Sequence, residues 1–298
     1  MKVNTAIVIV SWNGKEDLLE CLDSLENISG PRPRIIVVDN GSTDGTVAAV
    51  HKRFPDVDLL PLPENLGFTG GNNRGIEQAL DEGAEYVCLL NNDTVVDPDF
   101  LTQLLRAAVE YPQTGIFGSR VLYRSPPDKV WSQGISVERL TGRVYTAHYN
   151  RPIRKVPRVP ENVNGVSGAA MLLRARTLKE IGLFDEDYFL YFEDLDLCLR
   201  GRERGWEVTT IPTSKVYHSI SRSMGGEYSS RVVYYSTRNH LLLLNRRFPL
   251  PLLPRLLRNF LITLHTALFA LITADFQPLP WARGLRDYSR RRFGEMLN

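Results

Sequence analysis

Residues 34–46 read Arg-Ile-Ile-Val-Val-Asp-Asn-Gly-Ser-Thr-Asp-Gly-Thr, an apolar run that passes directly into a polar turn. An uninterrupted run of β-branched residues is typical of a strand that is buried on both faces of a parallel sheet. The Ser, Thr and Asp of the turn are residues that cap helix N-termini, and a helix is predicted over residues 46–54. The stretch therefore predicts one strand, loop and helix unit of an α/β fold.

The same order recurs on both sides of this stretch. Residues 5–10 predict a strand, and leucines at positions 18, 19, 22 and 25 follow at helical spacing. Residues 57–62 and 86–90 predict strands on either side of a helix over 72–82, and Pro98 stands in the first turn of another helix. This alternation predicts a mostly parallel, Rossmann-like sheet with helices on both faces, which binds ligands beyond the carboxyl ends of its strands.

The pattern is less regular in the second half of the chain. From about residue 115 to residue 160 it loosens into short strands and Pro- and Arg-rich loops, which we expect to pass over the sheet edge. Regular signals return with a strand near residues 171–173, an acidic and aromatic segment over 184–200, and a helix over 234–245. One large α/β domain with a C-terminal helical extension fits a chain of 298 residues.

Polar clusters follow directly on three of the predicted strands: Ser11-Trp12-Asn13, Asp39-Asn40 and Asn91-Asn92-Asp93. The carboxylate of Asp39 can accept hydrogen bonds from a ribose or a pyrimidine, or it can serve as a helix-capping Asx turn. Asp93 offers an oxygen ligand to a hard divalent cation, which needs few protein ligands when a diphosphate completes its shell. The alternative for Asp93 is a turn that ends at a proline.

Residues 184–196, Phe-Asp-Glu-Asp-Tyr-Phe-Leu-Tyr-Phe-Glu-Asp-Leu-Asp, place acids among aromatic and aliphatic side chains. Burial in such surroundings raises the proton affinity of a carboxylate toward that of a working base. Glu193, Asp194 and Asp196 also fall in the first turn of a helix, where acids are stabilising without any catalytic role. We favour a functional role for at least one of the three.

Two further features leave both a functional and a structural interpretation open. His218 follows a strand-like run and can ligate a metal or contact a phosphate, although a lone histidine is more often structural. The loop over residues 67–75 opens a helix and is a candidate anion site. Its glycines do not match G-x-G-x-x-G, and no G-x-x-x-x-G-K-[ST] occurs in the chain. The motifs of dinucleotide-binding proteins and of P-loop proteins are therefore both missing, which excludes these two classes.

Composition excludes several classes of protein. With 43% hydrophobic and 23% charged residues, the chain is too apolar for disorder and too polar for a polytopic membrane protein. Its three cysteines are isolated in sequence, so a disulfide framework and a structural zinc site are not expected and a reducing compartment is the default. The apolar run over residues 6–10 is too short for a signal peptide.

The net charge of +2 divides unevenly along the chain. Residues 246–298 hold nine Arg, no Lys and three acids, a net of +6, which leaves −4 for the first 245 residues. The cleanest apolar stretch of this tail, residues 260–274, is shorter than the ~20 residues of a membrane span. An interfacial amphipathic helix followed by arginines fits an anionic cytoplasmic leaflet; the alternatives are a dimerisation helix or helices that pack on the main domain.

The motifs together resemble a known family. Ile-Val-Ser-Trp-Asn (9–13), the turn over 37–46, Asn-Leu-Gly-Phe-Thr-Gly-Gly-Asn-Asn-Arg-Gly (65–75) and Leu-Leu-Asn-Asn-Asp-Thr (89–94) are similar to family 2 inverting glycosyltransferases with the GT-A nucleotide-sugar fold. They are most similar to the rhamnosyltransferase-like branch. The resemblance covers about residues 5–240 and implies a catalytic domain over 1–245, with a donor half to about 115 and an acceptor half after it. Residues 246–298 are then a membrane-associating tail.

For the donor site, the resemblance implies that Asp39 and Arg74 hold a pyrimidine and that Trp12 and Asn13 lie beside the nucleoside. Gly168 belongs to a stretch of small residues, 165–170, which would let the backbone approach the donor.

For the metal and the chemistry, the resemblance implies that Asp93, with Asn92, takes the metal-binding D-x-D position. It also implies that Asp194 is the catalytic base, with Glu193 as a supporting acid. The first acid of D-x-D is replaced by Asn91 here, which removes one carboxylate and gives His218 more reason to be a ligand. The expected cofactor is a divalent cation, manganese or magnesium.

The resemblance implies transfer of a sugar in a single in-line displacement. The first candidate donor is dTDP-rhamnose and the second a UDP-hexose; the expected acceptor is a glycan or a lipid-linked saccharide of the cell envelope. We expect the protein in the cytoplasm, peripheral on the inner face of the cell membrane, with no nucleic-acid partner and with homodimerisation left open.

Two other functions compete with this one. A sugar-phosphate nucleotidyltransferase is expected to carry an N-terminal Gly-rich loop with Arg or Lys, which Ser-Trp-Asn-Gly-Lys (11–15) matches poorly. A non-catalytic membrane partner that retains the fold is favoured only by Asn91.

Overall fold

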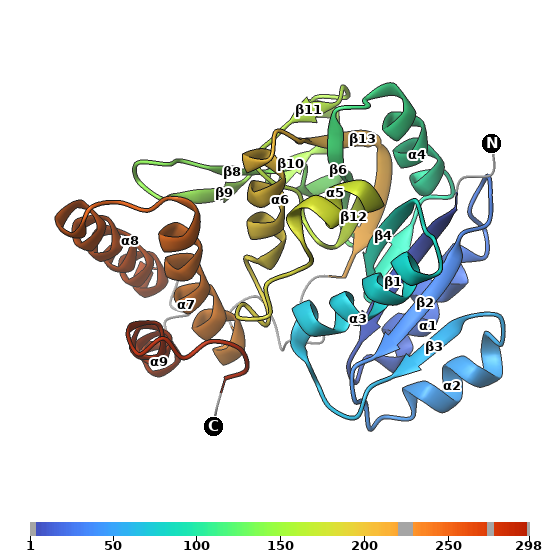
Figure 1. Ribbon diagram of the computed structural model, residues 1–298, viewed down its shortest axis with the longest axis horizontal. Coiled ribbons are helices and arrows are strands. Elements are labelled where there is room, and N and C mark those ends of the chain that lie inside the picture. Colours follow the sequence, from blue (N-terminus) through green and yellow to red (C-terminus); the bar gives the residue numbers. More distant parts are fainter. Residues whose placement is uncertain (1–3, 220–228, 273–276, 297–298) are drawn as a thin grey trace.

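Four parallel strands form the first half of the central sheet in the computed structural model, which describes residues 4–219, 229–272 and 277–296. They are β1 (Thr5–Ser11), β2 (Arg34–Asp39), β3 (Asp58–Pro61) and β4 (Tyr86–Asn91), in the order β3-β2-β1-β4. The helices α1 (Lys15–Leu25), α2 (Thr46–Arg53) and α3 (Gly67–Asp81) connect them (Figure 1). The predicted α/β architecture with a parallel half-sheet is confirmed.

Alternating residues of β1 supply the two cores of this half. Ile7 and Ile9 pack with leucines of α1 and with Phe100 of α4 (Phe100–Glu110), whereas Val8 packs with Ile76 of α3 on the other face. Because successive side chains of a strand point to opposite faces, one continuously apolar strand serves both layers. This is the reason that the apolar run had no polar alternation.

The second half of the sheet is mixed. The strand β12 (Ala170–Arg174) runs antiparallel to both β4 and β6 (Thr114–Tyr123), and β13 (Glu207–His218) runs parallel to β6 and antiparallel to β5 (Thr94–Val96). The short strands β7 (Lys129–Ser132), β10 (Arg151–Pro152) and β11 (Glu161–Asn162) pair at its edges, and β8 (Ile135–Val137) and β9 (Val144–Thr146) form a separate pair. A 3₁₀ turn covers Ile153–Lys155.

The expectation that the chain leaves the sheet at about residue 115 was wrong. Nine of the ten residues of β6 are buried inside the sheet. Glycines interrupt its apolar pattern because neighbours lie close: a Cβ on Gly118 would come within 2.5 Å of Cβ of Val166. Arg120 is buried in the same strand because its Nε donates to Oε1 of Gln133 at 2.6 Å. The loose segment begins only after residue 123.

The helix α3 begins at Gly67, five residues before its predicted start. Its glycines let it lie directly on β1: a Cβ on Gly71 would come within 2.7 Å of Cγ1 of Val10, and one on Gly75 would collide with Cγ1 of Val8. This close approach brings the N-terminus of α3 to the carboxyl edge of the sheet, beside the polar clusters.

The helices α5 (Ala175–Ile181) and α6 (Glu193–Glu203) complete the second half, and α7 (Ser230–Arg247), α8 (Leu252–Ile272) and α9 (Pro278–Ser289) form the C-terminal extension (Figure 1). The expected boundary at residue 245 falls inside α7, on which α9 packs closely: a Cβ on Gly284 would come within 2.8 Å of the Tyr234 carbonyl oxygen. Within the described ranges, no helix has both the length and the apolar character of a membrane span. Residues 273 and 274 of the predicted apolar stretch lie outside the described residues.

We expect Gly75→Ala to lower the free energy of unfolding although alanine is the better helix former. The added methyl group has no space against Val8, and overpacking of this kind costs about 1–3 kcal/mol, more than the ~1 kcal/mol gained in helix propensity. Gly201→Ala in α6 is the matched control, because its nearest contact would be an ordinary 3.4 Å to Cδ1 of Ile116. Urea denaturation measures the free energy of unfolding of both variants. Equal stabilities of Gly75→Ala and Gly201→Ala would contradict the packing argument.

Candidate active site

A cavity of about 340 Å³ opens at the carboxyl edge of β1 and β4. Its walls come from the ends of these strands, the start of α3, the end of β13, the start of α6 and the C-terminal extension. The cavity brings together seven of the residues that the sequence singled out: Trp12, Asn92, Asp93, Gly168, Glu193, Asp194 and His218.

Asp93 and His218 lie in contact, with Nε2 of the imidazole 2.8 Å from Oδ1 of the carboxylate. Both side chains are more than nine-tenths buried. They meet because β13 pairs with β5 in a register that sets His218 opposite Thr94, the residue after Asp93. The rings of Trp131 and His218 form a T-shaped contact with their centres 5.1 Å apart, and Nδ1 of His218 has no hydrogen-bond partner in the described part of the chain.

The Asp93 carboxylate and the His218 imidazole are both ligand types that manganese accepts. Among the described residues, no three or more His, Cys, Asp or Glu side chains lie close enough together to hold a metal ion by themselves. The protein thus offers two ligands here, Asp93 and His218. The side-chain amide of Asn91 is close by, with its Nδ2 atom 3.4 Å from Nε2 of His218. A metal bound in this position would take its remaining ligands from substrate and water.

The two acids at the start of α6 differ in their hydrogen bonds. Asp194, partly exposed to the cavity, accepts the Leu195 amide at 2.7 Å on Oδ1 and the Gly168 amide at 3.1 Å on Oδ2. Burial raises the pKa of Asp194, and these backbone donors oppose the shift. The pKa of Glu193 is raised well above its ordinary range by burial and, next, by the charge of Asp194. Oε2 of Glu193 has no partner among the described residues.

Three predicted donor residues lie outside this cavity. Asn13 adjoins it in a pair of loops, where its Oδ1 accepts the Thr43 amide at 2.8 Å. Asp39 is buried, and its Oδ2 accepts the Ser42 amide at 3.1 Å. Arg74 is exposed on α3, and its Nη1 lies 3.0 Å from Oε2 of Glu77.

Sequence reasoning missed a large part of the cavity wall. The guanidinium of Arg231 lies over the ring of Trp12 at 5.0 Å. The missed residues that line the cavity include Asn65, Trp131, Phe189, Leu190, Tyr191, Arg231, Tyr235, Glu295 and Met296. The aromatic residues over 189–191 stand directly before Glu193 and could have been included; residues 295 and 296 carry no local signal, because they reach the cavity only through the packing of α9 on α7.

Residues 6–182 match the profile described as glycosyl transferase family 2. The chain belongs to this family. This glycosyltransferase is 30% identical over 262 residues to the N-acetylglucosaminyl-diphospho-decaprenol L-rhamnosyltransferase of Mycobacterium tuberculosis (strain CDC 1551 / Oshkosh), covering 80% of this chain and 84% of the relative.

Two further proteins are similar to this glycosyltransferase at lower sequence identity. The low-salt glycan biosynthesis hexosyltransferase Agl10 of Haloferax volcanii is 25% identical to this glycosyltransferase, over 82% of this chain and 76% of the relative. The mannosyltransferase PcManGT from Pyrobaculum calidifontis, solved in complex with GDP-Man and Mn2+, superposes with a TM-score of 0.59 at 15% identity, covering 98% of this chain and 87% of that structure. The GT-A fold predicted for this glycosyltransferase is confirmed.

We expect Glu193→Gln to become more stabilising as the pH rises. The folded state raises the pKa of Glu193 above the ordinary 4.5, so the stability that its protonated form contributes is complete below pH ~4.5 and falls as the pH climbs toward the folded-state pKa. Glutamine cannot ionise and does not lose this stability.

Thermal unfolding at pH 5 and pH 8 measures the effect. The difference between variant and wild type should be larger at pH 8, whereas Glu203→Gln at the exposed end of α6 should change little at either pH. Parallel stability curves for Glu193→Gln and wild type would rule out a buried, proton-binding Glu193.

Proposed function

We propose that this glycosyltransferase moves a sugar with inversion from a dTDP- or UDP-sugar to a glycan or lipid-linked saccharide of the cell envelope. The observation that carries the proposal is the Asp194 carboxylate, held on two backbone amides in one cavity with the Asp93–His218 pair. L-Rhamnose from dTDP-rhamnose is the first candidate, because the mycobacterial relative is named for L-rhamnosyl transfer to a diphospholipid-linked sugar. A UDP-hexose is the second, in view of the archaeal hexosyltransferase.

Asp194 is the base of this reaction. Its carboxylate takes the proton of the acceptor hydroxyl as that oxygen attacks the anomeric carbon of the donor. The new carbon–oxygen bond forms as the bond to the diphosphate oxygen breaks, and the electron pair leaves with the nucleoside diphosphate. The configuration inverts in this one displacement, and no covalent enzyme intermediate is needed. The Gly168 and Leu195 amides hold the carboxylate so that its orientation does not depend on solvent.

Asp93 and His218 are the residues that would hold a divalent cation, manganese or magnesium. The cation would neutralise charge on the leaving diphosphate. Trp12, with Arg231 over its ring, and Asn92 form the donor side of the cavity, and Gly168 keeps the wall open there. Asn13, Asp39 and Arg74 remain candidates for contacts with the nucleobase beyond the cavity.

We expect Asp194→Asn to reduce transfer by about 10²–10⁴-fold, the usual contribution of a general base, while donor binding is retained. Transfer from labelled dTDP-rhamnose and from a panel of UDP-hexoses, with manganese or with a chelator, measures the activity; calorimetry with the nucleoside diphosphate measures binding. A chelated enzyme with an unchanged rate would overturn the metal assignment, and near-native transfer by the variant would overturn the role of Asp194.

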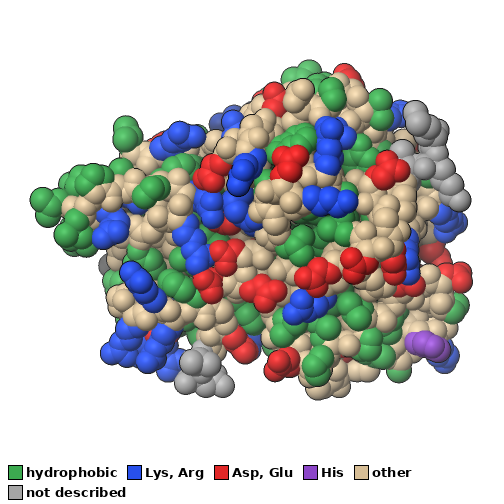
Figure 2. Space-filling view, in the orientation of Figure 1, with side chains coloured by type: hydrophobic (Ala, Val, Ile, Leu, Met, Phe, Trp, Pro, Cys, Tyr) green, Lys and Arg blue, Asp and Glu red, His purple; other side chains and the backbone are tan. Residues whose placement is uncertain are grey.

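We also propose that the C-terminal extension places the enzyme on the anionic inner face of the cell membrane. The helix α8 has its apolar side outward, while its buried Arg258 faces the protein and donates to the Phe248 carbonyl at 2.8 Å. Figure 2 shows hydrophobic side chains gathered at this end of the molecule, with basic side chains close by. In the part of α8 whose side chains are described, the exposed large apolar residues are Leu252, Leu253, Leu256, Leu257, Phe260, Leu261, Leu264 and Leu268.

Charge on the neighbouring segment is complementary to such a surface. The arginines at positions 286, 290, 291 and 292 are exposed on and after α9, and α8 itself contains no acidic residue. An apolar helix face beside clustered arginines suits insertion among anionic lipid headgroups. It would keep the active site near a lipid-linked acceptor.

We expect the triple variant Leu253→Ser, Leu257→Ser and Phe260→Ser to lose most sedimentation with vesicles of anionic phospholipid, because it removes three exposed apolar side chains from one helix face. Val109→Ser and Leu140→Ser, at exposed positions outside α8, serve as controls. Unchanged sedimentation would argue against the membrane proposal, and conversion of a dimer to a monomer by the triple variant would assign this face to self-association instead.

A further inference from the structure

The segment directly before the two acids has an unfavourable backbone. Phe189, Tyr191 and Phe192 have φ angles of 62°, 69° and 72°, in the left-handed region that residues other than glycine rarely adopt. Phe192 is the N-cap residue directly before α6, and residues 189–191 line the cavity. Such a conformation persists only where the surroundings enforce it.

The surroundings are supplied by α7. The side-chain amide of Asn239 donates to three carbonyl oxygens of the segment, those of Tyr188 at 2.8 Å, Leu190 at 2.7 Å and Tyr191 at 2.9 Å. Arg238 donates to the carbonyls of Asp187 at 3.0 Å and Tyr188 at 2.9 Å. Both side chains are fully buried.

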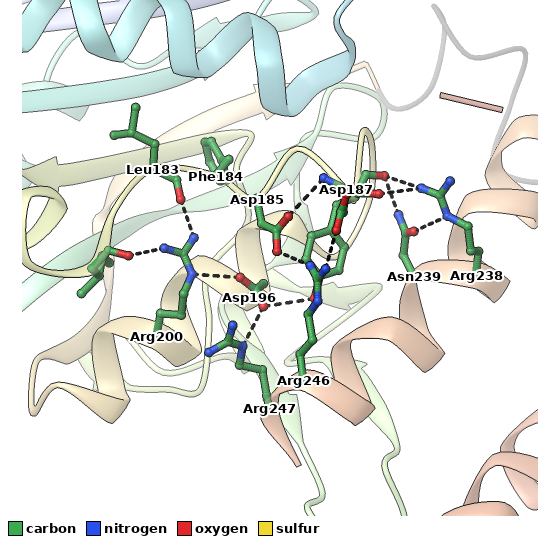
Figure 3. A network of polar contacts seen from close by, with 12 residues as sticks. Leu183, Phe184, Asp185, Asp187, Asp196, Arg200, Arg238, Asn239, Arg246 and Arg247 are labelled. Carbon is green, nitrogen blue, oxygen red and sulfur yellow. Dashed lines mark hydrogen bonds and ion pairs between the residues drawn. The ribbon is translucent and has the colours of Figure 1, made fainter. Parts of the chain in front are cut away.

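Arg238 also sets the orientation of Asn239. Its Nε donates to Oδ1 of Asn239 at 2.8 Å, which turns the NH₂ group of the amide toward the carbonyls. Figure 3 shows these two side chains side by side at the segment. A fourth hydrogen bond of Arg238, from Nη1 to the Gly294 carbonyl at 2.7 Å, ties the C-terminal segment that ends in the cavity to the same point.

Ring contacts and ion pairs extend this hold along α7. The ring of Tyr235 stacks on Phe189 at 5.4 Å, and the ring of His240 stacks on Phe192 at 5.1 Å. Farther along the helix, Arg246 pairs with both Asp185 and Asp187 (Figure 3). The segment over residues 185–192 is thus held by side chains of α7 from its first residue to its last.

We propose that Arg238 and Asn239 are positioning residues for sugar transfer: they hold the segment over residues 187–192, with its left-handed Phe189, Tyr191 and Phe192, in the conformation that leads into α6, and so set the place of the Asp194 carboxylate. The inference rests on the proposed role of Asp194 as base. Asp194 is two residues beyond Phe192, so a change of backbone at Phe192 moves the first turn of α6. A misplacement of about 1 Å at a reacting group can cost about 10²-fold in rate.

Asn239→Ala tests the proposal, with Leu241→Ala as the matched control. Leu241 is buried on the same helix, but it lines a small cavity between α7, α8 and α9. We expect Asn239→Ala to lower kcat about 10- to 100-fold while the dissociation constant of the nucleoside diphosphate stays within about twofold. Leu241→Ala should lower the melting temperature and leave kcat of the folded enzyme unchanged. Equal losses of kcat in the two variants would overturn the proposal.

Hydrogen exchange measures how firmly α7 fixes the segment over residues 185–192, independently of catalytic activity. In Asn239→Ala we expect faster exchange in the peptide over residues 185–193 and unchanged exchange in β1 and β4; unchanged exchange in that peptide would overturn the proposal. Arg238→Lys, which keeps the charge with fewer donors, provides a second variant if the first does not fold, with a smaller loss of kcat expected. If Asp194→Asn proved active, the role of the base would fail, whereas the exchange result would still decide whether α7 holds the segment.

Discussion

The buried carboxylate of Asp196 is the interaction on which the second half of the molecule depends. It has no exposed surface and accepts the Tyr188 hydroxyl at 3.0 Å, Nε of Arg200 at 2.9 Å and Nε of Arg247 at 2.8 Å. A buried charge is tolerated only with such partners, and loss of one partner leaves it uncompensated. Asp196 therefore joins α6, the segment before it and the end of α7 into one unit.

This unit explains why the C-terminal extension is not a simple appendage. The helix α7 contacts α6 through Asp196 and α9 through Tyr234, whose hydroxyl donates to Asp287 at 3.0 Å. The Met296 amide donates to the Tyr235 hydroxyl at 2.8 Å, which brings the last described residues to the cavity. A change in charge near residue 245 is real in the sequence, but the packing of the chain continues through that position.

The elements that were predicted correctly are those whose formation leaves a pattern in the local sequence. The strands β1, β2 and β4 and the polar clusters at their ends were predicted from apolar runs followed by turn residues, because burial on both faces leaves a local signature. β6 was missed because contacts with Val166 and Gln133, distant in the chain, require glycine and arginine inside a buried strand. The pairing of His218 with Asp93 depends on the register of β13 against β5, which is not a local property of the sequence. For α8 the sequence left open whether the leucines face outward or pack on the protein, since periodicity does not say which helix face meets the rest of the chain.

The two neighbouring acids show how packing assigns different chemistry to similar residues. Glu193 is buried and Asp194 is partly buried, which favours the neutral form of each. Only Asp194 receives two amide donors, and such donors stabilise the charged form. Glu193 therefore holds a proton more readily than Asp194 does, and the charge of Asp194 raises the pKa of Glu193 further. Packing alone thus gives two adjacent carboxyl groups different tendencies to ionise, with the greater tendency on Asp194.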